Sequence, residues 1–154
     1  MEVIETNNMF SEIEDNNNSE KIIENIKKGE LNDILNKFCF IDKNAIIINY
    51  IYFKYLATEQ TYSFILIYIT NIIDTVLLNN NELIIYINTK KLTLFDIDKH
   101  KIFIQNISCY FQEKYPDKLR KCYVYNAPFV FKHFFNIMSA FIDKKTIDKI
   151  ELVK

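Results

Sequence analysis

The chain has 154 residues and a mass of 18.5 kDa, and 49% of its residues are hydrophobic, which is enough for a single core. It contains one glycine, Gly29, so phosphate-binding loops and dinucleotide-binding turns, which need several glycines, are excluded. The net charge of −1 hides an asymmetry, because residues 1–20 hold six acids and no Lys or Arg, whereas the remainder carries 14 acids and 19 bases, a net charge of +5. A basic body would attract anionic lipid headgroups, although a solvated acidic arm on an ordinary mixed surface explains the same charges.

Cysteine usage and hydropathy indicate the compartment. Cys39, Cys109 and Cys122 are odd in number and widely spaced, so we expect free thiols in a reducing compartment, with neither a disulfide framework nor a zinc site. The most apolar window, residues 64–78, is shorter than the ~20 residues of a bilayer span and contains an Asn and an Asp. The sequence therefore predicts a soluble, cytoplasmic protein whose membrane contact is peripheral.

The amino-terminal part divides into an arm and a short helical segment. Residues 1–18 are polar, acidic and aperiodic, and we expect them to be disordered. The helical segment is expected over residues 19–41, where Ser19 can cap a first helix that ends at Gly29. A second helix would place four apolar residues on one side: Leu31, Ile34, Leu35 and Phe38. Residues 42–154 would then form one domain.

Strand-like and helix-like segments alternate through that domain. Strands are expected over residues 45–53, 83–88 and 122–125 and from Lys149 onward. Helices are expected over residues 59–78, 96–114 and 129–141, capped by Thr58, Asp96 and Asn126 respectively. This alternation predicts an α/β fold with a mainly parallel sheet, flanking helices and right-handed crossovers.

The last of these helices has an unusually broad apolar surface. Its polar residues Lys132, Asn136 and Ser139 form one narrow stripe, and aromatic or aliphatic side chains occupy almost everything else. Core packing is one explanation of such a surface, and contact with a lipid is the other.

The order of motifs in residues 115–154 resembles the CRAL-TRIO lipid-binding domain family, and in particular its yeast-type phosphatidylinositol transfer proteins. Five pieces occur in the family's order: Tyr115-Pro116-Asp117-Lys118-Leu119, Asn126-Ala127-Pro128, an aromatic helix over residues 129–141, Ile142-Asp143 and Lys149-Ile150. Upstream, the resemblance extends to about Asp42 only through the alternation of strands and helices. It implies a CRAL-TRIO-like sheet with an apolar gate helix over a lipid pocket.

The resemblance also implies site residues. The gate and acyl-chain walls would be Phe131, Phe134, Phe135, Met138 and Phe141. In members that bind phosphatidylinositol, an acid after the Tyr-Pro pair and the lysine that starts the last strand contact the inositol phosphate, and Asp117 and Lys149 match them here. Such contacts are chemically sensible, because a lysine neutralises phosphate and a carboxylate accepts from inositol hydroxyls. Lys118 and Lys43 are further headgroup candidates. A turn after Pro and a strand start explain Asp117 and Lys149 in purely structural terms, and a solvated side chain is the alternative for Lys118.

Three departures from the family carry expectations of their own. The glycine, arginine and proline usual before the first strand are replaced by Asn44 and Ala45 after Asp42-Lys43, which weakens a headgroup contact from that side. Leu83 and Ile85 stand where choline-lipid binders present hydroxyl groups, which argues against phosphatidylcholine. The chain stops after the last strand, where the family continues over the back of the sheet, so we expect a homodimer or another partner to cover that face.

Residues suited to catalysis are sparse. His100 and His133 accompany no nucleophile motif and are expected at the surface, and capping explains Asp96 and Asp98 more simply than a carboxylate pair does. We therefore expect neither an enzyme nor a metal site, no nucleic-acid partner, and no cofactor apart from a phospholipid ligand. Two functions remain: binding and transfer of phosphatidylinositol or a phosphoinositide between membranes, and, as the alternative, a lipid-free protein interaction module on the same fold.

Overall fold

The structure is a computed structural model and describes residues 31–154. The expected acidic arm and the helix from Ser19 to Gly29 lie outside the described residues. The division of the chain into segments of 1–18, 19–41 and 42–154 stays a prediction. The second expected helix is α2 (Leu31–Phe38), and it buries Ile34, Leu35 and Phe38 on one side as predicted.

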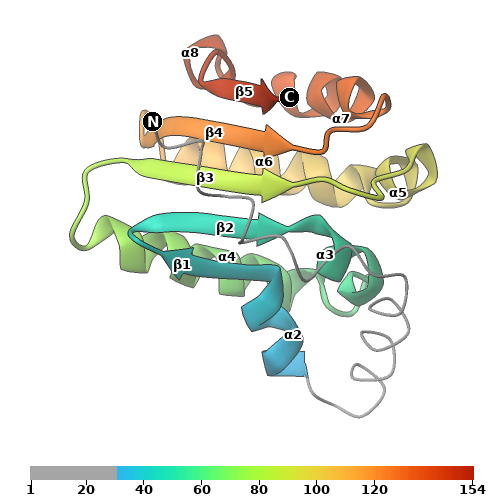
Figure 1. Cartoon of the computed structure of the whole chain (residues 1–154), viewed down its shortest axis with the longest axis horizontal. Helices are drawn as coiled ribbons and strands as arrows, with labels where there is room; N and C mark the ends of the chain where they lie inside the picture. Colours follow the sequence, from blue (N-terminus) through green and yellow to red (C-terminus); the bar gives the residue numbers. More distant parts are fainter. Residues whose placement is uncertain (1–30) are drawn as a thin grey trace.

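A five-stranded sheet with the order β1-β2-β3-β4-β5 forms the centre of the molecule (Figure 1). Its strands are β1 (Cys39–Asp42), β2 (Ala45–Asn49), β3 (Leu83–Asn88), β4 (Leu119–Tyr125) and β5 (Ile150–Val153). Only the first pair is antiparallel, since a tight hairpin at Lys43 and Asn44, both with positive φ, connects β1 to β2. The predicted mainly parallel α/β fold is confirmed, and β1 is an addition that the sequence reasoning did not foresee.

The strand predicted over residues 45–53 is wrong in its second half. The strand ends at Asn49, whose side-chain Nδ2 donates to the Lys37 carbonyl at 3.1 Å, and α3 (Tyr50–Leu56) follows at once. Helix α3 buries Tyr50, Ile51, Tyr52 and Leu56. A segment that is apolar apart from one Asn suits a buried strand and a buried helix equally well, because its apolar residues show no clear periodicity.

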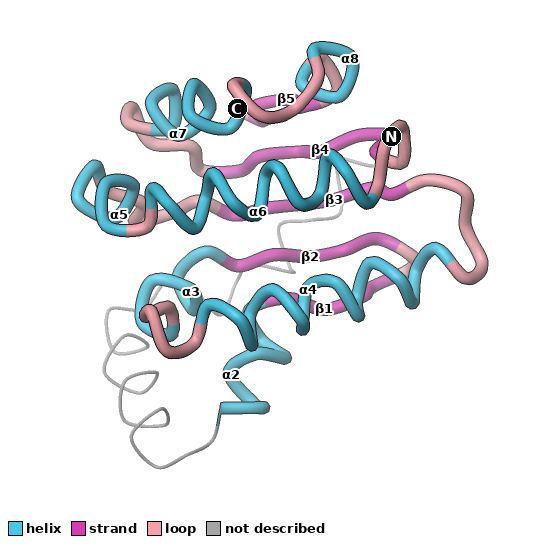
Figure 2. Tube along the Cα trace, turned by 180° about the vertical axis from the view of Figure 1, so that it is seen from behind, coloured by secondary structure: helices cyan, strands magenta, loops and turns pink. Residues whose placement is uncertain are grey.

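Two long helices, α4 (Tyr62–Leu77) and α6 (Lys101–Lys114), cover one face of the sheet (Figure 2). Because β2, β3 and β4 follow one another across the sheet, crossovers of a single hand place both helices on the same side. Helix α4 starts three residues later than expected, since Thr61 Oγ1 first closes a turn by accepting from the Thr58 N–H at 2.8 Å and donating to the Leu56 carbonyl at 2.9 Å.

The helix predicted over residues 96–114 is two helices, α5 (Leu94–Lys99) and α6, which meet at His100. Asp96 takes part in capping, but as the third residue of α5. The Asp96 N–H donates to Thr93 Oγ1 at 3.2 Å, and the Thr93 N–H donates to the Asp96 carboxylate at 3.1 Å. This reciprocal capping box satisfies two N–H groups that the start of a helix otherwise leaves unpaired.

The carboxyl-terminal part contains α7 (Phe131–Ser139) and α8 (Lys144–Ile147) before β5. Asp143 caps α8 by accepting from the Thr146 N–H at 2.8 Å. Side chains in register across parallel strands share a face, so Ile47, Tyr86 and Tyr123 lie in one row. The core packs in two clusters, the larger around α4 and the smaller around Ile104 of α6 and Val124 of β4.

Candidate functional site

Lys149 lies immediately before β5, at the end of the sheet where the parallel strands begin. Its Nζ donates to the Leu119 carbonyl at 2.7 Å, and the residue is half-buried. This bond holds the cation at the amino-terminal edge of β4. A lysine ammonium has three N–H donors, so two of them are available to a phosphate.

Asp117 lies in the turn that precedes β4 and has φ 59°, in the left-handed region. Its carboxylate Oδ1 is 3.4 Å from Lys145 Nζ, and both side chains are exposed. An exposed ion pair contributes about 0–1 kcal/mol, so a ligand can replace it at little cost. Lys118, also exposed, follows in the same turn, and its carbonyl accepts from the Leu83 N–H at 2.7 Å.

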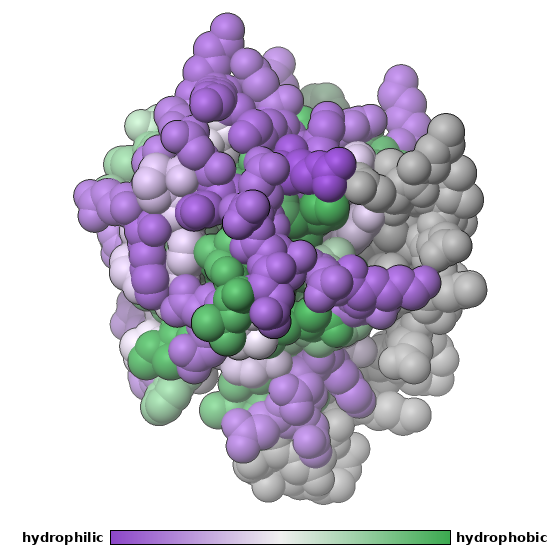
Figure 3. All heavy atoms as spheres, turned by 90° about the vertical axis from the view of Figure 1, so that its left-hand side faces the viewer, coloured by the Kyte–Doolittle hydropathy of each residue, from purple (hydrophilic) through white to green (hydrophobic). Residues whose placement is uncertain are grey.

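The structure therefore brings three of the four predicted headgroup residues to the start of β4 and β5: Asp117, Lys118 and Lys149. Lys43 lies at the same end of the sheet but in the β1–β2 hairpin, and β3 separates β2 from β4. At ~4.8 Å per strand spacing, the hairpin is about 10 Å or more from the other three. Figure 3 shows this end of the molecule, where hydrophilic side chains surround a smaller hydrophobic area.

The corner between β4 and α7 differs from the prediction. Asn126 does not cap the helix: it has φ 55°, and its side-chain Nδ2 donates to Asn88 Oδ1 at 3.1 Å. The amide thus ties the ends of β3 and β4 together. Helix α7 starts at Phe131, after a turn in which the Phe131 N–H donates to the Pro128 carbonyl at 3.0 Å.

The five predicted wall residues of the gate helix divide by burial. Phe131 is buried in the smaller core cluster, with its ring centroid 5.5 Å from that of Phe134 and 6.4 Å from that of Phe135. Phe134 and Phe135 are half-buried against the same cluster, Met138 is half-buried, and Phe141 is exposed beyond the helix. Part of the broad apolar surface is therefore core, on the side of the sheet that α6 covers.

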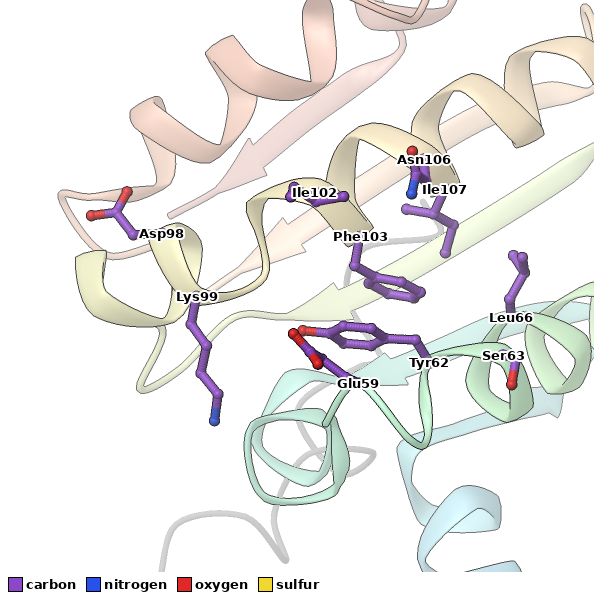
Figure 4. Close-up of a pocket in the computed structure, with 10 residues that line it drawn as sticks. All are labelled: Glu59, Tyr62, Ser63, Leu66, Asp98, Lys99, Ile102, Phe103, Asn106 and Ile107. Atoms are coloured by element: carbon purple, nitrogen blue, oxygen red, sulfur yellow. The ribbon is translucent and has the colours of Figure 1, made fainter.

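A groove of about 410 Å³ lies between α4 and the α5–α6 segment (Figure 4). Its floor is an aromatic stack, in which the Tyr62 and Phe103 rings lie 4.4 Å apart at an interplanar angle of 10°. The other apolar lining residues are Leu66, Ile102 and Ile107. The polar lining residues are Glu59, Ser63, Asp98, Lys99 and Asn106. Such a groove can take an apolar chain with a polar end.

Sequence reasoning missed the groove residues. Their positions in the sequence could have indicated the contact. Tyr62 and Phe103 lie in the first turns of two consecutive crossover helices, and such helices are neighbours on a parallel sheet. Neither residue belongs to a motif. The side on which each ring packs depends on how the helices meet.

A buried polar cluster lies beside the groove. Lys54 Nζ is 3.2 Å from the Asp96 carboxylate and donates to the Lys91 carbonyl at 3.0 Å. Burial by itself would raise the pKa of Asp96, but the neighbouring Tyr50 hydroxyl, Lys54 and the hydrogen bond from Thr93 together lower it below its ordinary value. Asp96 is therefore ionised at neutral pH and holds α5 against α3.

His100 is buried, which corrects the expectation of a surface residue. Its Nδ1 hydrogen-bonds to the Tyr62 hydroxyl, and the Phe53 and Tyr62 rings meet it edge-on. Burial, followed by the positive charge of Lys99, lowers the pKa of His100. His133 is exposed as predicted, with Nε2 3.7 Å from Asp98 Oδ1.

The three cysteines are free thiols, as predicted, and only Cys109 is exposed. Residues 31–154 contain no helix long and apolar enough to cross a membrane. Within the same range, no group of three or more His, Cys, Asp and Glu side chains is placed to hold a metal ion.

Comparison with known proteins places these features in a family. A family model described as the CRAL/TRIO domain matches residues 32–154. The Sec14 cytosolic factor of Schizosaccharomyces pombe is 37% identical over 51 residues, which cover 33% of this chain and 18% of that protein. The crystal structure of Sfh5 superposes with a TM-score of 0.59 at 20% sequence identity, covering 75% of this chain and 46% of that chain. The chain thus spans less than half the length of either relative. The chain belongs to the CRAL/TRIO domain family.

Proposed function

We propose that this protein binds phosphatidylinositol or a phosphoinositide and transfers it between membranes. Membership of the CRAL/TRIO family implies lipid binding. The observation that carries the finer proposal is the position of Lys149, half-buried and held 2.7 Å from the Leu119 carbonyl, beside the turn that contains Asp117. A lysine fixed in this way neutralises a phosphodiester, and an adjacent carboxylate accepts from ring hydroxyls.

The dimensions of the sheet suit an extended phospholipid. Strand β4 separates the Lys149 end of the sheet from α7, and its seven residues span about 20 Å. One leaflet of a bilayer, headgroup included, is about 20–22 Å thick. A headgroup at Lys149 would therefore place the acyl ends near Phe134, Phe135 and Met138.

Helix α7 is proposed as the movable wall of the pocket. The buried Phe131 anchors its first turn, whereas Phe134, Phe135, Met138 and Phe141 keep part of their surface exposed. No α7 residue lines the 410 Å³ groove, and Phe131, Phe134 and Phe135 pack against the smaller core cluster. Room for two acyl chains beneath α7 therefore requires this helix to move away from the core. Leu83 and Ile85 offer no hydroxyl group to a choline lipid, which supports an inositol headgroup.

Site of action and partners follow from this proposal. We infer a cytoplasmic, non-catalytic carrier that contacts membrane surfaces transiently and binds no nucleic acid. A homodimer stays a prediction. Its argument was that the back of the sheet would expose apolar surface, but Tyr86 and Tyr123 on the face opposite α4 and α6 are already buried, so less of that surface needs a partner. Sedimentation at micromolar concentration tests it, and a monomer there would contradict the dimer.

The alternative function is a lipid-free interaction module. The observation that favours it is the small groove, together with the packing of Phe131, Phe134 and Phe135 against the core. In this case α7 stays closed and no acyl chain enters.

Lipid extraction and mass spectrometry of the purified chain, after incubation with cellular lipids, separates the two functions. Lys149→Gln is the informative variant, because its amide can still donate to the Leu119 carbonyl but carries no charge. Lys121→Ala is the control, since Lys121 is not among the candidate headgroup residues and its Nζ pairs at 3.4 Å with the exposed Glu151. Inositol lipid bound by the wild type and the control but lost in Lys149→Gln supports the proposal. Absence of lipid from all three supports the interaction module, and equal phosphatidylcholine in all three contradicts the headgroup site.

A further inference from the structure

Large apolar side chains are exposed at the end of the molecule where the parallel strands finish. Phe129, in the turn before α7, is 99% exposed, and Phe95 on α5 is 74% exposed. Ile102 on α6 and Leu94 on α5 are exposed to 73% and 49%. Exposed apolar residues that gather in one region mark an interaction surface more often than isolated ones do.

These residues belong to neighbouring segments. His133 of α7 and Asp98 of α5 approach to 3.7 Å; His133 is four residues after Phe129 and Asp98 is three residues after Phe95. Figures 1 and 2 both place α5 and α7 side by side at this end of the sheet. We call the surface formed by Leu94, Phe95, Ile102 and Phe129 the apolar tip.

The apolar tip is not needed by the core. Within α5, Asp96 and Ile97 are buried and secure the helix, whereas Leu94 and Phe95 point outward. In the β4–α7 corner, Phe131 is buried and Phe129, two residues earlier, is not. Each segment therefore carries aromatic surface beyond what its packing uses.

Positive charge surrounds the apolar tip. Residues 89–101 and 126–133 contain five lysines and two acids. One acid, Asp96, is buried and paired with Lys54, and the other, Asp98, lies beside His133. Lys99, Lys101 and Lys132 are exposed. Aromatic side chains ringed by lysines suit the interface of an anionic bilayer, where rings enter the headgroup region and ammonium groups meet lipid phosphates.

We propose that the apolar tip is a membrane-docking surface, with an anionic lipid bilayer as its partner. The inference rests on the proposed lipid-transfer function, because it assigns the surface through which the carrier meets donor and acceptor membranes. Docking here would present α7 to the bilayer and leave Lys149 at the opposite end of the sheet. A protein partner is the competing occupant, and the surplus of lysines with few paired acids favours lipid.

Sedimentation of the full chain with sucrose-loaded vesicles tests the proposal, with vesicles of phosphatidylcholine alone and of phosphatidylcholine mixed with phosphatidylserine. Phe95→Ala and Phe129→Ala should each weaken binding about tenfold on both vesicle types. Replacing Lys99, Lys101 and Lys132 by Ala should weaken binding about fivefold per lysine, and only where phosphatidylserine is present.

Two controls match these variants. Phe64→Ala removes an aromatic side chain of 59% exposure from α4, outside the apolar tip, and Lys37→Ala removes an exposed lysine from α2. Both should bind vesicles as the wild type does. The proposal is overturned if the wild type does not bind vesicles, if the Phe95 and Phe129 variants bind normally, or if Phe64→Ala is equally impaired.

Mass spectrometry of lipid in the same preparations separates this inference from the proposed function. Vesicle binding lost in the Phe95 and Phe129 variants, with the bound inositol lipid retained, supports both. Vesicle binding that depends on these residues in a chain that never carries lipid supports the docking surface and overturns the carrier function.

Discussion

Removing the Asp96 carboxylate is the sharpest test of how the carboxyl-terminal end of the sheet is held together. The side chain of Asp96 is 10% exposed, pairs with Lys54 at 3.2 Å and closes the capping box of α5 with Thr93. Helix α5 has six residues and carries Phe95 of the apolar tip. Such a short helix depends on its cap and its tertiary contacts, because isolated helices below ~12–15 residues are marginal.

The expected cost follows from these contacts. Loss of the cap costs ~1 kcal/mol and loss of a hydrogen bond to a charged group ~1.5–3 kcal/mol. Asp96→Ala should therefore lower the free energy of unfolding by about 3 kcal/mol, out of a typical ~5–15 kcal/mol. Asp96→Asn can still accept from the Thr93 N–H but loses its charge, so it should cost about half as much.

Urea denaturation followed by circular dichroism measures both values. The pKa of Asp96 is lowered in the folded state from its ordinary value of 3.8, so its contribution is complete above pH 3.8 and is lost as pH falls through the lower, folded pKa. The difference between wild type and Asp96→Asn should therefore vanish in strong acid. Equal cost for the Ala and Asn variants, or a cost for Ala below ~1 kcal/mol, would refute the role of Asp96 as both cap and ion-pair partner.

Three further predictions use single side chains. Burial lowers the pKa of His100 from its ordinary value of 6.5, so below about pH 6.5 the unfolded chain binds a proton at His100 more readily than the folded chain does. The urea midpoint of the wild type should therefore fall as the pH drops below about 6.5, and that of His100→Gln should not. Cys109 should react with a thiol reagent in the folded protein, whereas Cys39, whose pKa burial raises to about 12, should react only on unfolding, as peptide mass spectrometry can show. Phe131→Ala should lower the free energy of unfolding by ~3–5 kcal/mol, because Phe131 is buried, and Phe129→Ala by less than ~0.5 kcal/mol, because Phe129 is exposed. The same denaturation assay measures both, and the reverse order would contradict the assignment of Phe131 to the core and Phe129 to the surface.

Several local features of the fold were readable from the residues. The strand over residues 83–88 was predicted with its observed bounds, since six residues rich in isoleucine stand between an Asn-rich turn and a polar loop. Pro116 and the positive φ of Asp117 produce the turn before β4, and Pro116 made that turn predictable. The motif order of residues 115–154 was enough to identify the family before any fold was known.

The errors have a common physical origin. Residues 45–53 are apolar apart from Asn49, and the strand ends at Asn49, whose side chain donates to the Lys37 carbonyl. Asn126 is a good capping residue by type, but the end of β3 supplies Asn88 as a competing partner. His100 was expected at the surface because its sequence neighbours are charged, yet it is buried against Phe53 and Tyr62. In each case a residue distant in sequence decided the outcome.

Local sequence patterns were enough to predict the types of most elements, their order and the parallel α/β class, because apolar periodicity and turn residues act over a few neighbours. The sequence could not show that Lys149 lies beside the turn of Asp117 or that Tyr62 stacks on Phe103. It also could not show that Phe131 is core while Phe129 faces solvent. Periodicity shows which side chains share a face of an element. Whether that face packs against the sheet, another helix or solvent depends on contacts between segments far apart in the chain. The candidate site is formed by contacts of this kind.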